Sequence, residues 1–208
     1  GGVWYTAQRR EALGYLDPET GETRHIFLGD GSAPHGVIVS EDGTPWITDG
    51  GLNAIVRVDP ETLAVDVFPL PPGHPNANLN TATFDHNGNL WFTGQNSVYG
   101  RLDPRTGDME VFDAPRGRWS YGIATSSDYD VYYASLVGSY VGHIDPKTEE
   151  ATVLEPPTSG QGARRVWPDS QGRIWVSEWN ADRSFFTIRR ATSGANGNSQ
   201  GQAREPMR

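Results

Sequence analysis

An Asp-Pro turn recurs along the chain at a nearly constant interval. The pairs begin at positions 17, 59, 103 and 145, so the steps between them are 42, 44 and 42 residues. Aromatic residues stand at matching points of the same series: Trp4, Trp46, Trp91, Tyr132 and Trp175. Because two separate markers share one interval, the chain is built from copies of a single structural unit.

Each unit reads as four short β-strands. In the second unit the strands are GVIVS, PWITD, AIVRVD and VDVFPL, with Asp42-Gly43 in the turn of the first hairpin. The turns are too closely spaced for the helices of about 10 or more residues that a helical solenoid would need. Four strands repeating every 40–50 residues or so are the signature of a β-propeller blade. The predicted fold class is all-β, a β-propeller of four-stranded blades.

The predicted strands do not add up to whole blades. Residues 3–29 and 162–190 supply three strands each, and one complete blade is expected in each of three ranges: 33–70, 78–113 and 119–154. About four and a half blades are therefore present, and we expect a propeller domain over residues 1–190 that is a truncated part of a larger propeller. Residues 191–208 are expected to form a disordered polar tail, because they have too little apolar surface to offset their ordering entropy.

Composition restricts the classes of partner. Lys+Arg 17 against Asp+Glu 26 gives a net charge of -9, which repels a phosphate backbone, so no nucleic acid partner is expected. No apolar run approaches the roughly 20 residues of a membrane helix, and the first ten residues lack the apolar region of a signal peptide. There is no cysteine and the first residue is not Met. The compartment stays open: we expect a soluble protein, cytoplasmic or secreted, with its native N-terminus missing.

The first hairpin of each unit brings the ends of its strands to a common edge. Residues facing each other in an antiparallel hairpin are equidistant from its turn, so a turn centred on Asp42 pairs His35 with Asp49. The same arithmetic gives three further pairs: Asn80 with Gly94, Tyr121 with Ser135 and Arg164 with Glu178. Since the first strand of a blade lies nearest the propeller axis, these residues are expected to ring one mouth of the channel, where ligands usually bind.

Each of these candidates also has a purely structural interpretation. His35 can be a hydrogen-bonded group at a strand end, and Asp49 can cap the turn that follows it. Arg164 and Glu178 can form a cross-strand salt bridge, worth at most about 1 kcal/mol at the surface. The recurrent aromatic series is interpreted as packing between blades rather than as a platform for a substrate. The sequence has no G-x-S-x-G, P-loop, H-E-x-x-H or G-x-G-x-x-G pattern.

Three stretches resemble the repeats of the virginiamycin B lyase (streptogramin B lyase) family: APHGVIVSEDGTPWITDGGLNAIVRVDP, GNLWFTGQNSVYGRLDPRTG and GRIWVSEWN. The resemblance covers about residues 3–181. It implies a seven-bladed propeller that lacks two or more blades here. It also implies an Mg²⁺-dependent elimination that linearises streptogramin B cyclic depsipeptides. In that reaction a histidine removes a proton α to a carbonyl while the metal stabilises the developing enolate.

The resemblance assigns roles to individual residues. His35, in a Pro-His-Gly motif, would be the general base. Asp49 stands where the family has a metal-associated glutamate, and Glu178 matches the glutamate of the family's W-F-T-E pattern, so both are candidate ligands for Mg²⁺. The other residues of the mouth are candidate substrate-binding residues: Asn80, Tyr121 and Arg164.

One departure from the family pattern leaves two classes of function open. Catalytic members have a second histidine in the next blade, whereas this chain has Asn80 there. One possibility is a carbon–oxygen lyase acting on a streptogramin-type cyclic depsipeptide or a related ester. The other is a non-catalytic propeller that binds a small molecule, a peptide or a protein at its channel mouth, and a lactonase-type hydrolase is a more distant third. The expected partner is a small-molecule or cyclic-peptide ligand, and the protein is expected to be a monomer.

Overall fold

The structure is a computed structural model that describes residues 2–117, 119–157, 159–180 and 185–189. These residues form 18 strands and one short 3-10 helix, η1 (Gln8–Arg10). The strands make five antiparallel sheets, each with its strands in sequence order. The first sheet contains β1 (Val3–Ala7), β2 (Ala12–Leu16) and β3 (Thr23–Phe27). The last contains β16 (Ala163–Pro168), β17 (Arg173–Glu178) and β18 (Phe185–Arg189).

The three central sheets have four strands each. The second sheet contains β4 (Pro34–Val39), β5 (Pro45–Asp49), β6 (Ala54–Val58) and β7 (Val65–Pro69). The third contains β8 (Leu79–Phe84), β9 (Leu90–Gly94), β10 (Val98–Leu102) and β11 (Met109–Asp113). The fourth contains β12 (Ser120–Thr125), β13 (Val131–Ser135), β14 (Tyr140–Ile144) and β15 (Ala151–Leu154). The predicted all-β class and the division into strands are confirmed.

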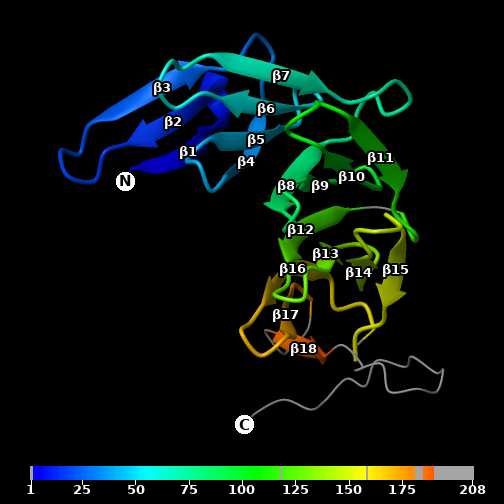
Figure 1. Ribbon diagram of the computed structural model, residues 1–208. Helices are drawn as coiled ribbons and strands as arrows, with labels where there is room; N and C mark the ends of the chain where they lie inside the picture. The colour runs from blue at the N-terminus through cyan, green and yellow to red at the C-terminus, as the bar shows by residue number, and fades with distance from the viewer. Residues whose placement is uncertain (1, 118, 158, 181–184, 190–208) are drawn as a thin grey trace.

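The sheets follow one another along an arc, with the N-terminal sheet and the C-terminal sheet at its two ends (Figure 1). The first strands of the complete sheets lie on the concave side and the last strands on the convex side. Contacts between sheets link β4 to β8, β8 to β12 and β12 to β16. We therefore call the sheets blades 1 to 5 in chain order, and the first strands line the predicted channel side. The predicted tail at 191–208 lies outside the described residues.

The Asp-Pro turns owe their shape to the aspartate side chain. In all four, the carboxylate of Asp17, Asp59, Asp103 or Asp145 accepts a hydrogen bond from the backbone N–H two residues later, at 2.8 to 2.9 Å. Proline fixes φ at the next position, so the turn is preorganised. In one copy, hydrogen bonds from Arg105 lower the pKa of Asp103 to about 2.

The described residues contain no helix with the length and apolar character of a membrane span.

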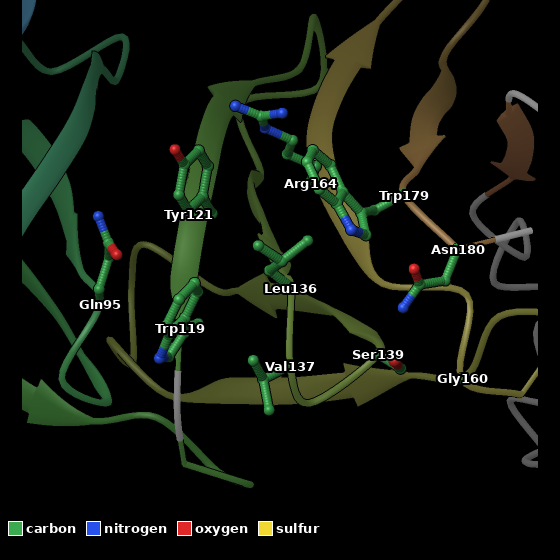
Figure 2. Close-up of a pocket in the computed structure, with 10 residues that line it drawn as sticks. All are labelled: Gln95, Trp119, Tyr121, Leu136, Val137, Ser139, Gly160, Arg164, Trp179 and Asn180. Atoms are coloured by element: carbon green, nitrogen blue, oxygen red, sulfur yellow. The ribbon is translucent and has the colours of Figure 1, made fainter.

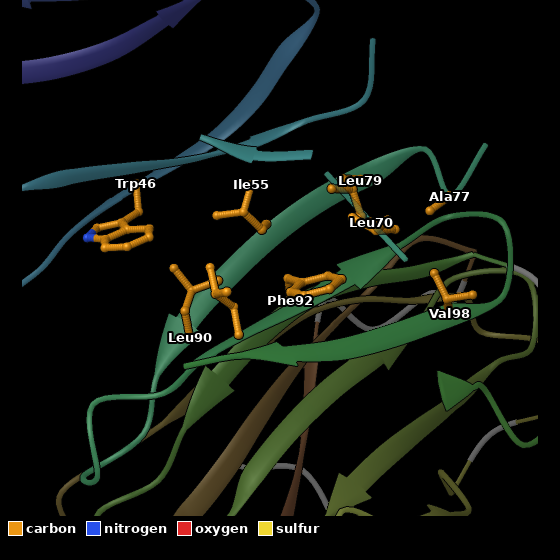
Figure 3. Close-up of a cluster of buried hydrophobic side chains, with 9 residues drawn as sticks. Trp46, Ile55, Leu70, Ala77, Leu79, Leu90, Phe92 and Val98 are labelled. Atoms are coloured by element: carbon orange, nitrogen blue, oxygen red, sulfur yellow. The ribbon is translucent and has the colours of Figure 1, made fainter. Parts of the chain in front are cut away.

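The hydrophobic core is divided into clusters, each between two neighbouring blades. Trp46 and Ile55 of blade 2 pack against a group of buried residues of blade 3 and its approach: Leu70, Ala77, Leu79, Leu90, Phe92, Val98 and Leu102 (Figure 3). Trp4, Trp91 and Tyr132 occupy the same place in the other clusters. Four of the five aromatic residues of the recurrent series therefore pack between blades, as predicted.

In blades 1, 3 and 4, a glycine makes room for an aromatic ring on the neighbouring strand. Gly14, Gly100 and Gly142 stand opposite Tyr5, Phe92 and Tyr133 in the strand register. A Cβ atom at Gly142 would lie 2.0 Å from the nearest ring atom of Tyr133, and one at Gly14 would lie 2.2 Å from that of Tyr5. The ring occupies the space that a side chain would fill.

Replacing Gly142 with alanine should destabilise the protein more than the same change at Gly14. The Tyr133 ring is fully buried and has no free space to move into, whereas Tyr5 is partly exposed and can turn aside. We expect Gly142→Ala to lower the free energy of unfolding by about 1–3 kcal/mol, as overpacked cores do. Urea denaturation of both variants measures the difference. Equal losses at the two positions would show that the ring contact is not what requires glycine.

Candidate functional site

In blades 2 to 5, the first hairpin carries a β-bulge close to its open end. The strand register shifts by one residue between Pro34 and Gly36, and the same shift follows Leu79, Ser120 and Ala163. The predicted pairing of His35 with Asp49 is therefore wrong by one residue, because Pro34 faces Asp49. The other predicted partners shift in the same way: Leu79 faces Gly94, Ser120 faces Ser135 and Ala163 faces Glu178. A bulge changes the direction of a side chain, which is why bulges are common beside functional sites.

Hydroxyl groups of the preceding blade hold the bulges in place. Thr6 donates to the carbonyl oxygen of His35 across 3.1 Å. In the same way, Thr48 donates to the carbonyl of Asn80 and Thr93 to that of Tyr121. The backbones of His35, Asn80 and Tyr121 are thus held by strands β1, β5 and β9 of the blades before them.

His35 lies at the bulge of blade 2 with its side chain exposed. Its Nδ1 atom is 3.0 Å from the carbonyl oxygen of Asn80. Because a carbonyl oxygen can only accept, Nδ1 carries the proton and the lone pair of the neutral ring is on Nε2. The ring also meets Tyr121 of blade 4 edge to face, with the two ring centroids 6.3 Å apart. His35 therefore has a structural hydrogen bond on one nitrogen and a basic lone pair on the other.

Asp49 is fully buried and its carboxylate caps the turn after β5. Oδ1 accepts from the backbone N–H groups of Ala33, Gly51 and Leu52 at 2.8 to 3.0 Å, and Oδ2 accepts from the Ser32 hydroxyl. These four donors occupy the lone pairs that a metal ion would need. This geometry matches the structural interpretation of Asp49, in which its side chain caps the turn that follows it.

The remaining predicted site residues are in different environments. The Asn80 side chain is completely buried, and its amide has no hydrogen-bond partner among the described residues. Tyr121 is partly exposed, Arg164 is exposed and Glu178 is partly exposed at the end of β17. The bulge places Ala163, and not Arg164, opposite Glu178 in the strand register. No three His, Asp or Glu side chains within the described ranges come together as a metal site.

A pocket of about 570 Å³ opens beside Tyr121 and Arg164, between blades 4 and 5 (Figure 2). Figure 2 shows Trp119 and Tyr121 on one side, Trp179 and Asn180 on the other, and Leu136 and Val137 between them. The remaining lining residues are Gln95, Ser139, Gly160 and Arg164. The Arg164 guanidinium lies over two aromatic rings, with its Cζ 5.5 Å from the Tyr121 centroid and 5.0 Å from that of Trp179. Aromatic walls with a few polar groups are typical of small-molecule sites.

The sequence analysis found Tyr121 and Arg164 but missed the two tryptophans beside them. Trp119 directly precedes β12 and Trp179 directly follows β17, so both lie outside the periodic strand pattern. The backbone N–H of Trp179 bonds to the carbonyl of Gln161, which brings the two loops of blade 5 together. The two loops occupy equivalent positions at the mouth end of their hairpins, and this equivalence is the sequence signal that could have identified both tryptophans.

Solved structures with the same fold include two streptogramin lyases. A catalytically inactive virginiamycin B lyase from Staphylococcus aureus with quinupristin is 24% identical, with a TM-score of 0.80. The match covers 93% of this chain and 64% of that one, so this chain spans less than two thirds of that protein. A streptogramin B lyase structure is 21% identical, with a TM-score of 0.81 and coverage of 100% and 66%. These likenesses establish the shared propeller fold.

A third match extends the fold beyond lyases. The extracellular domain of a one-component system from B. thetaiotaomicron is 14% identical, with a TM-score of 0.72. That match covers 92% of this chain and 26% of the other. No curated protein sequence matches the chain. The sequence model described as the Virginiamycin B lyase family matches residues 1–193, and the chain therefore belongs to this family.

Proposed function

We propose that this protein is a lyase that linearises a streptogramin-type cyclic depsipeptide, or a related ester, by elimination at the channel mouth. The orientation of the His35 ring carries the proposal. Its Nδ1–H is committed to the carbonyl of Asn80, which leaves the Nε2 lone pair on an exposed side chain. A neutral imidazole with a free, accessible nitrogen is the usual general base for removing a proton from carbon.

In this mechanism, Nε2 of His35 takes the proton from a carbon next to a carbonyl group. The electrons of the broken C–H bond form a C=C bond as the β C–O bond of the ester breaks. The ester oxygen leaves as part of a carboxylate, and no water is added. The Nδ1 hydrogen bond keeps the ring in the required tautomer, and the positive charge that develops on the ring strengthens that bond.

Magnesium, which the resemblance implies, would polarise the carbonyl group of the substrate. Asp49 does not fit the role of a ligand, because four donors already surround its carboxylate in a buried turn. Glu178 is at the mouth end of β17, with a partly exposed side chain, so it is the residue of this chain that we propose as a magnesium ligand.

A second candidate function is binding without catalysis. Two observations favour it: Asn80 occupies the bulge of the blade after His35, and the pocket between blades 4 and 5 is lined by aromatic side chains rather than by acids and bases. In this case the mouth would bind a small molecule, a peptide or a protein. The two candidate functions differ in whether a bound depsipeptide is converted to a linear product.

The His35→Asn variant separates the two roles of the histidine. An asparagine amide can still donate to the Asn80 carbonyl from nearly the position of Nδ1, but it has no basic nitrogen at the position of Nε2. Asparagine also occupies the equivalent bulge of blade 3 at Asn80, so the backbone accepts it. We expect turnover of a streptogramin B depsipeptide to fall by about 10²-fold or more, with an unchanged melting temperature.

Mass spectrometry of the product is the measurement. Elimination yields a linear product with the mass of the substrate, whereas hydrolysis adds the mass of one water. A wild-type protein that binds the depsipeptide without converting it would establish the second candidate function. Full turnover by His35→Asn would exclude His35 as the base.

The metal assignment predicts opposite behaviour for the two carboxylates. Asp49→Asn should lower the free energy of unfolding by about 1–3 kcal/mol with or without magnesium, because it removes an acceptor from a buried turn. Glu178→Gln should remove the rise in melting temperature that millimolar MgCl₂ produces in the wild type. Sodium chloride at equal ionic strength is the control. A magnesium response that disappears with Asp49→Asn and survives Glu178→Gln would reverse the assignment.

A further inference from the structure

The pocket between blades 4 and 5 collects exposed apolar side chains. Trp119 is 41% exposed, Val137 60% and Trp179 62%, and all three line this pocket. Exposed apolar side chains that gather in one hollow mark a binding surface more often than single ones do. The pocket lining contains no aspartate or glutamate among the described residues, and it contains one arginine. Its chemistry therefore suits a flat apolar group and disfavours a cation.

The backbone at Trp119 is in an unfavourable conformation. Its φ is 71°, in the left-handed region that bulky residues rarely adopt. The equivalent positions of the neighbouring blades are Asn78 with φ 52° and Gly162 with φ 67°, and these residue types tolerate the conformation. A tryptophan here therefore replaces a residue that suits the backbone better, and it does so at the edge of the pocket. Strain of this kind is concentrated at binding sites.

The Arg164 guanidinium has no carboxylate partner in the part of the chain that the structure describes. It lies over the rings of Tyr121 and Trp179 at cation–π distance. Arginines bind planar acidic groups well, because the guanidinium presents paired donors in a rigid geometry. Arg164 thus supplies an anion-binding end to a pocket whose other walls are aromatic.

We propose that this pocket binds an aromatic ring that carries a carboxylate or another acidic oxygen. The ring packs against Trp119 and Trp179, and the acidic oxygens accept hydrogen bonds from Arg164. The inference goes beyond the elimination reaction and does not depend on it, since His35 contributes nothing to the pocket lining. A depsipeptide with an aromatic acidic substituent would be held at both places, and a simple aromatic acid would be held at this pocket alone.

Benzoate is the probe, with benzyl alcohol and cyclohexanecarboxylate as the neutral and the non-aromatic counterparts. Titrations followed by the indole N–H signals in ¹⁵N NMR spectra give the dissociation constants. For so small a ligand we expect a Kd on the order of 1–10 mM for benzoate, and clearly weaker binding of both counterparts. Arg164→Gln should bring benzoate down to the affinity of benzyl alcohol.

Trp119→Asn is the decisive variant because the residue equivalent to Trp119 in blade 3 is already Asn78. We expect the melting temperature to stay the same or rise, since asparagine suits the left-handed backbone, while benzoate binds about tenfold or more weakly. Trp167→Asn is the matched control: Trp167 is 68% exposed but does not line the pocket, so its removal should leave the Kd unchanged.

Two outcomes would overturn the inference. One is benzoate binding that Trp119→Asn and Trp167→Asn weaken equally. The other is the absence of any shift of the Trp119 indole signal at benzoate concentrations far above the expected Kd. Because no turnover is measured, failure here would leave the elimination reaction intact, and failure of the elimination reaction would leave benzoate binding intact.

Discussion

The threonine-to-carbonyl hydrogen bonds between neighbouring blades are the contacts on which the mouth of this propeller depends. Thr6, Thr48 and Thr93 each reach across to a carbonyl oxygen that a β-bulge has turned toward them. A buried carbonyl needs such a partner, and a bulge removes the ladder bond that would otherwise supply one. Close approach also needs space: a Cβ at Gly36 would lie 2.6 Å from the carbonyl oxygen of Asn80. The bulge, the threonine hydroxyl and the glycine thus act together to form the contact between two blades.

This contact involves the backbone of the bulge residue and leaves its side chain to vary from blade to blade. The neighbouring blade contacts the main-chain carbonyl of the bulge residue, so the side chain of that residue can change without loss of the contact. The four bulges carry a histidine, an asparagine, a tyrosine and an arginine. His35 is a partial exception, because its Nδ1 adds a second bond to the Asn80 carbonyl. In blade 3 the hydroxyl of Thr81 makes the corresponding second bond, to the carbonyl of Tyr121. Part of the role of His35 is therefore structural, and only Nε2 is available for chemistry.

The sequence was sufficient for the strands and the blades, because a period of about 42 residues and alternating apolar positions depend on local chain geometry. It failed at the register of the residues around the mouth. Counting from Asp42 assumes an unbroken ladder, and the bulge beside His35 is stabilised by Thr6 of another blade, which no local pattern reveals. Asp49 could be interpreted as a cap or as a ligand until its four donors were known. Trp119 and Trp179 lie in loops, where periodicity carries no information.

The pocket and His35 lie on the same rim but in different blades, and the backbone strain at the two places differs. In blades 3, 4 and 5, the residue just before the first strand has a left-handed backbone conformation: Asn78, Trp119 and Gly162. A tryptophan there lowers stability by about 1 kcal/mol relative to glycine or asparagine. The bonds between blades are distributed along the whole arc, so a single unfavourable residue does not disrupt them. The scaffold can therefore accommodate strain at Trp119 while the bulge at His35 keeps its ring orientation, and the residue before the strand can change without disturbing the His35 ring.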